Sequence, residues 1–166
     1  MSRDEPSRRS FLRGAFLTAS GLIGSGSLLE QGRLLADLAG DPDPEVPNEE
    51  VARILREISA GKPIKRGHVS LDMPVVAEDG RIVPVIIESD LPMAPERHVK
   101  SIHLIVDHNP DAHLAAFYLS PAVGSVSIST RIKMKRTTWV RALARTSDDE
   151  VWAAYARVQV TLNGCG

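Results

Sequence analysis

The residue best suited to chemistry is Cys165, the only cysteine of the 166-residue chain and its penultimate residue. Only the thiolate form is nucleophilic, and an unperturbed thiol with a pKa of about 8.5 is a few per cent ionised at neutral pH. Gly164 and Gly166 flank the cysteine and Asn163 precedes them, and these residue types tolerate a wide range of backbone conformations. We therefore expect a flexible arm that holds the thiol about 10 Å beyond the last strand.

The sequence around Cys165 lacks the groups that would activate a thiol. No basic cluster or helix start lies beside it, and the terminal carboxylate of Gly166 disfavours the thiolate. An enzymatic nucleophile needs a neighbouring base and a held orientation, which a glycine-flanked tail does not supply. We therefore expect Cys165 to be the covalent attachment point for a substrate, activated by other enzymes, in a protein that is not itself an enzyme.

The N-terminal segment has the form of an export signal. Arg8 and Arg9 precede the pair Phe11-Leu12, and residues 14–29 carry no charge. This pattern resembles a twin-arginine signal, whose apolar part is here too short and too rich in Gly and Ser to be a stable membrane anchor. We expect residues 1–40 to be the signal and linker, residues 41–166 to be the folded domain, and the mature protein to lie in the periplasm.

Composition limits the fold and the partners of the mature chain. Removal of an export segment leaves material for about one domain, and many Val and Ile residues with few aromatic ones favour strands over a helical bundle. The formal net charge is −1, with acids and bases interspersed. Because no basic stripe can neutralise phosphates, we expect no nucleic-acid partner.

One short amphipathic helix is expected after the proline-rich linker at 41–47. Its apolar residues recur at helical spacing, at Val51, Ile54, Leu55 and Ile58. Asn48 is placed as an N-cap and Gly61 as a C-terminal stop. We expect this helix to pack on the domain.

From His68 onward the apolar residues recur with a period of two, between turn signals spaced as in a β-sandwich. We expect strands near 68–73, 81–89, 99–107, 114–120, 125–135, 137–145 and 151–162. Asp79-Gly80 predicts a tight turn between the first two, while Pro74 and Pro84 indicate edge positions or bulges. The predicted fold is an all-β, antiparallel β-sandwich with a short N-terminal helix.

Two of the predicted strands alternate most clearly. In 125–135, one face is apolar and the other carries Ser, Arg and Lys, which predicts one buried and one solvated face. In 151–162, the residues predicted to point inward are Trp152, Ala154, Ala156, Val158, Val160 and Leu162. The opposite face carries Tyr155, Arg157 and Gln159.

Other polar residues give no comparable signal. The histidines His98, His103, His108 and His113 stand five residues apart, and an odd step cannot place them on one face of one strand or helix. We therefore expect scattered surface and loop histidines and no metal site. The acidic residues at turns, Asp72, Glu78, Asp79, Asp107 and Asp111, are expected to have backbone roles without catalytic pairing.

Together these features resemble the SoxY family, the sulfur-compound carriers of bacterial thiosulfate oxidation. The likeness runs from about Ile54 to the end and rests on the twin-arginine signal, Pro74 to Pro84 with Ala77-Glu78-Asp79-Gly80, Asn109-Pro110, Ser129-Thr130-Arg131-Ile132 and the Gly-Cys-Gly tail. The family tail is usually Gly-Gly-Cys-Gly-Gly. This chain has Asn163 at its first position and ends one glycine early, so its arm is expected to be somewhat more restricted.

The resemblance implies an immunoglobulin-like sandwich that forms a heterodimer with a SoxZ-like subunit. It also implies that a c-type cytochrome joins thiosulfate to Cys165 as an S-thiosulfonate. A sulfate-releasing hydrolase and a sulfane dehydrogenase would then act on the attached intermediate. No cofactor is expected apart from the sulfur substrate bound covalently to Cys165.

Two other roles for the thiol remain open. A single cysteine cannot form an internal disulfide. A second hypothesis is therefore a β-sandwich interaction protein whose Cys165 only forms an intermolecular disulfide. A third hypothesis is an oxidoreductase or sulfurtransferase that uses Cys165 as its own nucleophile. Sulfur mass gained from thiosulfate would identify a carrier, and turnover by the purified chain alone would identify an enzyme.

Overall fold

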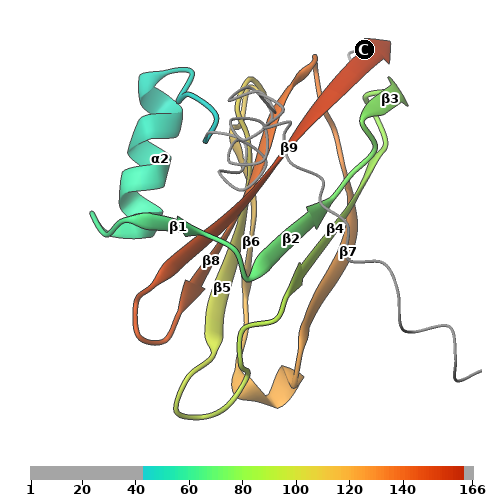
Figure 1. Cartoon of the computed structure of the whole chain (residues 1–166). Helices are drawn as coiled ribbons and strands as arrows, with labels where there is room; N and C mark the ends of the chain where they lie inside the picture. Colours follow the sequence, from blue (N-terminus) through green and yellow to red (C-terminus); the bar gives the residue numbers. More distant parts are fainter. Residues whose placement is uncertain (1–42, 163–166) are drawn as a thin grey trace, which may run out of the picture. The chain divides into compact units, whose positions relative to one another are not determined.

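The computed structural model describes residues 43–162, which form two packed β-sheets and one α-helix (Figure 1). The helix α2 spans Glu49–Ser59, and a short 3-10 turn, η1, spans Pro121–Val123. The strands are β1 (Ile64–Arg66), β2 (Val69–Asp72), β3 (Val76–Asp79), β4 (Val83–Ser89), β5 (Val99–Val106), β6 (His113–Tyr118), β7 (Val126–Ile132), β8 (Thr138–Thr146) and β9 (Val151–Leu162). Within residues 43–162 no helix is long and apolar enough to cross a bilayer.

The two sheets form the predicted immunoglobulin-like sandwich. The larger, six-stranded sheet has the order β1-β9-β8-β5-β6, with β3 pairing to β9 as well, and the smaller sheet has the order β2-β4-β7. All seven of the predicted strand segments are present as strands, with ends that differ by a few residues. The prediction of a mostly β sandwich with one short N-terminal helix is confirmed.

Two short strands, β1 and β3, were not predicted. Each pairs in parallel with β9, β1 along Val151 to Ala153 and β3 along Gln159 to Leu162. The sandwich is therefore not purely antiparallel, although all the other strand pairs are antiparallel. Segments of three or four residues are too short for a period-two pattern to be recognised, so their pairing is decided by the neighbouring strand.

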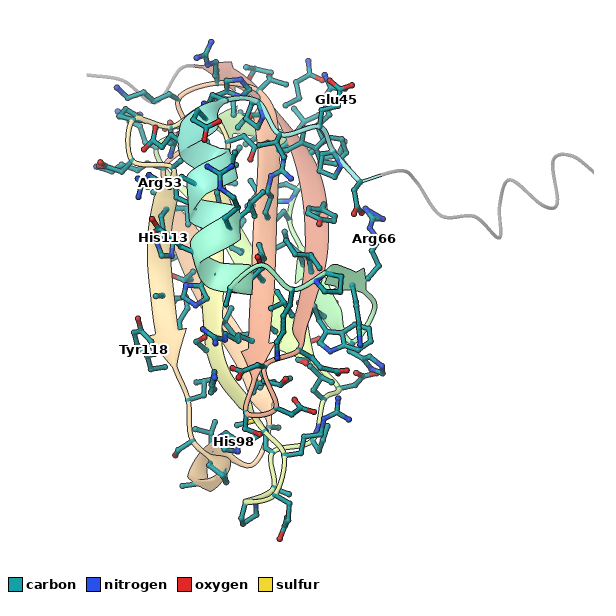
Figure 2. The ribbon with its side chains drawn as sticks, turned by 90° about the vertical axis from the view of Figure 1, so that its left-hand side faces the viewer. Glu45, Arg53, Arg66, His98, His113 and Tyr118 are labelled. Atoms are coloured by element: carbon teal, nitrogen blue, oxygen red, sulfur yellow. The ribbon has the colours of Figure 1, made fainter. Side chains whose placement is uncertain are left out.

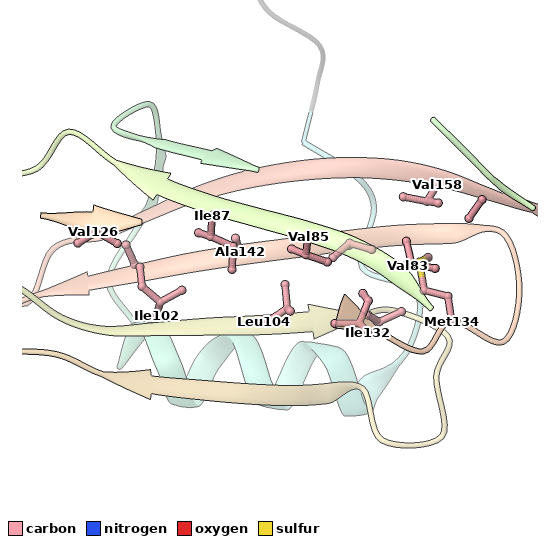
Figure 3. Close-up of a cluster of buried hydrophobic side chains, with 14 of the residues drawn as sticks. Val83, Val85, Ile87, Ile102, Leu104, Val126, Ile132, Met134, Ala142 and Val158 are labelled. Carbon is pink, nitrogen blue, oxygen red and sulfur yellow. The ribbon is translucent and has the colours of Figure 1, made fainter. Parts of the chain in front are cut away.

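The apolar core lies between the two sheets (Figure 3). Side chains that are completely buried there come from both sheets, including Val83, Val85, Ile87, Ile102, Leu104 and Val140. In β7 the predicted alternation is confirmed, because Val126 and Ile132 are buried while Ser127, Ser129 and Arg131 are exposed. One face of β7 is core and the other faces solvent.

A second core lies between the larger sheet and α2. Val51, Ile54 and Ile58 of the helix pack on the outer face of the sheet, against Ile105, Leu143, Val151 and Ala153. In β9, Trp152, Val158 and Val160 face the sandwich as predicted. Tyr155 was placed on the face opposite the core, but it packs into this second core, because α2 covers the outer face.

The ends of α2 follow the sequence signals closely. The Oδ1 atom of Asn48 accepts a hydrogen bond from the backbone N–H of Val51 at 2.9 Å, as expected of an N-cap. At the other end Ala60 already adopts a left-handed conformation, with φ of 51°, and Gly61 continues it with φ of 76°. The helix therefore ends at Ser59, two residues before the predicted glycine stop.

The Asp79-Gly80 turn exists but joins different strands from those predicted. The backbone N–H of Arg81 donates to Oδ1 of Asp79 at 2.8 Å, which closes a turn between β3 and β4. Pro84 lies in β4, which is the central strand of its sheet, and not in an edge strand. Since β2 pairs with β4 only as far as Ile86, Pro84 has a neighbouring strand, β7, on one side only, so the β4 segment at Pro84 is locally an edge.

Candidate functional site

Strand β9 is the described part of the chain that leads to the candidate attachment residue. Cys165 and the arm residues Asn163, Gly164 and Gly166 lie outside the described residues, as do Arg8 and Arg9 of the export signal. The predictions made for them therefore stay predictions. What the structure does define is the base from which the arm starts, at Thr161 and Leu162.

The end of β9 is held on two sides. Strand β8 pairs with β9 as far as Val158, and β3 pairs with β9 from Gln159 to Leu162 (Figure 1). Three further hydrogen bonds secure this stretch: Gln159 N to Val75 O at 2.9 Å, Val160 N to Thr137 Oγ1 at 3.0 Å, and Thr161 Oγ1 to Glu78 O at 3.1 Å. The arm thus begins from a fixed strand.

Loops from three parts of the chain surround this end of β9. The backbone N–H of Met134 donates to Gly80 O at 2.7 Å, which ties the β7–β8 connection to the β3–β4 turn. The side chain of Asn109 donates to Lys133 O at 2.6 Å and accepts from Lys135 N at 3.1 Å. The side chain of Asn109, in the predicted Asn109-Pro110 turn, therefore joins the β5–β6 loop to the β7–β8 connection. These contacts restrict the movement of the loops at the end of β9.

A shallow hollow of about 510 Å³ lies beside the base of the arm. It is lined by Val75, Thr137, Arg157 and Gln159. Arg157 and Gln159 come from the solvent-exposed face of β9, and Thr137 from the β7–β8 connection. This surface is polar and cationic and offers no buried group to a ligand.

A buried ion pair, which was not predicted, lies beneath Pro44 and Glu45, just before α2. Arg141 and Asp107 are 2% and 1% exposed, and they form a bidentate contact, with Nε to Oδ1 at 2.6 Å and Nη2 to Oδ2 at 2.8 Å. Arg141 also donates to the backbone carbonyls of Pro44 and Glu45. Asp107 lies at a turn as predicted, but its carboxylate also neutralises a buried guanidinium, which was not predicted.

Two of the histidines come together, contrary to the expectation of scattered surface residues. Nδ1 of His103 on β5 lies 3.1 Å from Nε2 of His113 on β6, and Nε2 of His103 lies 3.0 Å from Oγ of Ser101. The positions are adjacent because β5 and β6 pair, with His113 and Tyr118 along the edge strand (Figure 2). His103 is buried, and a hollow of about 370 Å³ adjoins the pair.

The other three histidines stay apart from this pair. His108 contacts Thr138 through Nδ1 at 2.7 Å, His68 contacts Asp90 through Nδ1 at 2.7 Å, and His98 lies near the lower end of the sandwich in Figure 2. Among residues 43–162 no three side chains of His, Cys, Asp or Glu come close enough together to hold a metal ion.

A comparison with protein families matches residues 56–165 to the family described as sulfur oxidation protein SoxY. The chain belongs to the SoxY family. The match covers both sheets and the end of α2, and it reaches Cys165 as its last residue. The SoxY resemblance seen in the sequence is thereby confirmed.

Solved structures support the same fold. The sulfur carrier protein SoxY from Chlorobium limicola f thiosulfatophilum is similar with a TM-score of 0.57 and 20% identity, over 68% of this chain and 96% of that one. A superoxide reductase (neelaredoxin) from Ignicoccus hospitalis is similar with a TM-score of 0.51 and 14% identity, over 57% and 80% of the two chains. At such identities the likeness concerns the fold alone. None of the curated proteins matches the chain.

Sequence reasoning missed the ion pair and the histidine pair for different reasons. Arg141 had a readable signal, because a cation within the apolar run Val140, Ala142 and Leu143 predicts a buried partner. The histidine pair had none, since the contact depends on the register of β5 against β6. Neither pair is evidence for the SoxY function, and both are contacts that stabilise the larger sheet.

Protonation of His103 is expected to destabilise the domain. Burial, followed by the charges of His113 and Arg145, lowers the pKa of His103 from 6.5 to about 4. Between these pH values the unfolded chain binds a proton that the folded chain does not, so the free energy of unfolding falls as the pH falls from about 6.5 to about 4. The shift corresponds to up to about 3 kcal/mol. Thermal unfolding of wild type and His103→Gln across this range measures it.

The His103→Gln variant should lose this part of the pH dependence. The titratable and polar groups around His103 are His113, Ser101, Tyr118, Lys100, Arg145 and, from α2, Glu57. His68→Gln is the control for losing a histidine elsewhere, since His68 is exposed and contacts Asp90 at 2.7 Å. The fall in stability between pH 6.5 and 4 should remain in this variant. An unchanged pH dependence in His103→Gln would show that other groups dominate the acid sensitivity.

Proposed function

We propose that this protein is a covalent carrier of sulfur intermediates in thiosulfate oxidation, with Cys165 as the attachment residue. The observation that carries the proposal is that the SoxY match extends to Cys165, three residues after a strand whose end is held by β3 and by Oγ1 of Thr137. A thiol on a short tail, at a firmly held base, suits presentation to other proteins. Asn163, Gly164 and Gly166 form the swinging arm in this proposal.

The attachment of thiosulfate to Cys165 is an oxidation and needs an external oxidant. The Cys165 thiol and thiosulfate join through a new S–S bond to give the S-thiosulfonate, and one proton and two electrons are released. A c-type cytochrome accepts the electrons. Water then attacks the outer sulfur, which leaves as sulfate with the release of one proton. The inner sulfur keeps the other proton and stays on Cys165 as a persulfide (Cys–S–SH) for further oxidation. The chain itself supplies the attachment atom and its position, and partner enzymes supply the activation.

The same proposal includes a cellular setting. Export through Arg8 and Arg9 brings the folded protein to the periplasm, where a SoxZ-like subunit pairs with it. The partner enzymes are the c-type cytochrome, a sulfate-releasing hydrolase and a sulfane dehydrogenase. Cell fractionation of wild type and Arg8→Lys/Arg9→Lys tests the export step, since the variant should be retained in the cytoplasm.

The decisive experiment is the intact mass of the protein isolated from its own organism after growth on thiosulfate, before and after reduction. Thiosulfonate or sulfane mass on the C-terminal peptide is expected in wild type and is expected to be absent from Cys165→Ser. A bare thiol, or only a dimer of twice the mass, would contradict the carrier proposal. The dimer would support the interaction protein that uses Cys165 for an intermolecular disulfide.

A further inference from the structure

The two paired histidines of the larger sheet lie at a separation that suits a shared metal ion. Nδ1 of His103 and Nε2 of His113 are 3.1 Å apart, and the ring centroids are 5.2 Å apart. Two imidazole nitrogens that each bind one ion at about 2.0–2.1 Å lie about 2.8–3.4 Å apart, for angles of about 90–109° at the ion. These two nitrogens can therefore bind one ion after small rotations of the rings.

A β-bulge places His113 on the same face of the sheet as His103. The pairing that sets His103 opposite Ala116 shifts by one residue further along, so that Ile105 lies opposite His113. Without this shift His113 would lie opposite Val106, whose side chain is in the inner core. Ile105 packs against α2 on the outer face, so the shift turns His113 outward, onto the face that carries His103. Bulges of this kind re-aim a side chain and are frequent beside functional sites.

The second nitrogen of His103 is already engaged. Nε2 lies 3.0 Å from Oγ of Ser101, two positions earlier on β5. When Nε2–H donates to this hydroxyl, Nδ1 presents its lone pair, and such a contact fixes the orientation of a metal-ligating ring. His103 is only 9% exposed, which further restricts its rotation. His103 is therefore a fixed ligand, and the exposed His113 is the one that adjusts.

A hollow of about 370 Å³ gives the pair access to solvent. Its lining includes both histidines and Tyr118, which projects from the same edge strand as His113 (Figure 2). Among residues 43–162 no third side chain of His, Cys, Asp or Glu completes a ligand set. A closed structural zinc site has four protein ligands, so an ion held here keeps open positions that water from the hollow fills.

The charges around the hollow limit the kind of ion that can bind. Lys100 and Arg145 line it, and both pair with one carboxylate, that of Asp149, at 2.5 Å and 2.7 Å. Glu57 of α2 is the acid in the lining, and it pairs with Arg53. The surroundings are not acidic, so calcium and magnesium, which need several oxygen ligands, are disfavoured. An ion that binds imidazole strongly is required.

We propose that His103 and His113 form a two-histidine site for a divalent transition-metal ion, and that copper(II) is the ion bound most tightly. Imidazole nitrogen suits copper, nickel and zinc, and the Irving–Williams order places copper(II) above the other two. The proposed site does not include Cys165. The inference is therefore independent of the proposed carrier function.

The test uses the full chain with Cys165→Ser, because a free thiol would itself bind or reduce copper. Calorimetric titration with copper(II) gives the affinity, and nitrogen coupling in the electron paramagnetic resonance spectrum gives the number of imidazole ligands. We expect one ion coupled to two imidazoles, and weaker binding of nickel(II) and zinc(II). In the same background, Ser101→Ala is expected to weaken copper binding about tenfold, and His113→Gln by at least as much with loss of the two-imidazole coupling. His108→Gln is the matched control and should bind as tightly as its parent, since His108 is an exposed histidine that contacts Thr138.

Thermal unfolding of the same variants gives a second readout, since an ion that binds only the folded chain raises the midpoint. Copper(II) should raise the midpoint of the parent and leave that of His113→Gln unchanged. Copper binding of equal strength in the parent and in His113→Gln, or coupling to a single imidazole, would overturn the inference, and so would binding only above about 1 mM copper. The pair would then be a hydrogen bond alone. Tighter binding of nickel(II) or zinc(II) would contradict the assignment of copper(II).

Discussion

Replacing Arg141 with leucine is expected to lower the free energy of unfolding by about 3–5 kcal/mol, because it leaves Asp107 buried without a counter-charge. Both side chains are almost completely buried, and two hydrogen bonds join them. The substitution also removes the donor for the carbonyls of Pro44 and Glu45. We therefore expect faster proteolytic cleavage of the segment before α2, in addition to a lower denaturation midpoint in urea.

Two further variants separate the buried charge from the rest of the effect. Arg141→Leu/Asp107→Leu removes both charges and should recover much of the stability lost in the single variant. Arg145→Leu, four residues along the same strand, breaks a partly exposed pair with Asp149 and should cost less than about 1 kcal/mol. A loss below about 1 kcal/mol in Arg141→Leu would show that Asp107 gains water or another partner when the guanidinium is absent.

Replacing Ile87 with alanine is expected to cost about 2–5 kcal/mol, because Ile87 is fully buried between the two sheets (Figure 3). The loss combines the transfer free energy of the missing methyl and methylene groups with the cavity that they leave. Chemical denaturation, with an unchanged slope against denaturant, measures it.

The neighbouring residue provides a matched control. Ile86 has the same side chain on the same strand, but it points to the other face and is 38% exposed. Ile86→Ala should therefore cost less than about 1 kcal/mol. Equal losses for the two variants would contradict the assignment of the β4 faces, since a shift of register by one residue would exchange them.

The sequence predicted most of the fold because the long elements carry strong local signals. The alternation in β7 and the spacing of Val51, Ile54 and Ile58 each indicated the right element and the right buried face. In contrast, the role of Tyr155 was misjudged. Its strand alternates as expected, but α2 covers the face that local pattern assigns to solvent. A period-two pattern shows which residues share a face and does not show what lies on it.

The prediction that Cys165 is the attachment residue rests on local features of the sequence, and it stays a prediction because the structure describes residues 43–162. A single cysteine between glycines is visible in the chain itself, and so is the tail length that limits its reach. The surface around the base of the arm was not predictable. Lys135 and Arg157 are 22 positions apart in sequence. They lie at the same end of the sandwich because β8 pairs with β9 and because Asn109 holds the β7–β8 connection in place.

By itself, the sequence determined the β-sandwich class, the capped helix, the SoxY family and the identity of the single thiol, because each is encoded in short-range patterns. The tertiary structure alone decided which acids neutralise which cations. It paired Arg141 with Asp107, brought His103 to His113, and attached β1 and β3 in parallel to β9. These contacts join residues far apart in the chain, and their energies depend on burial, which arises only when the sheets and α2 pack together.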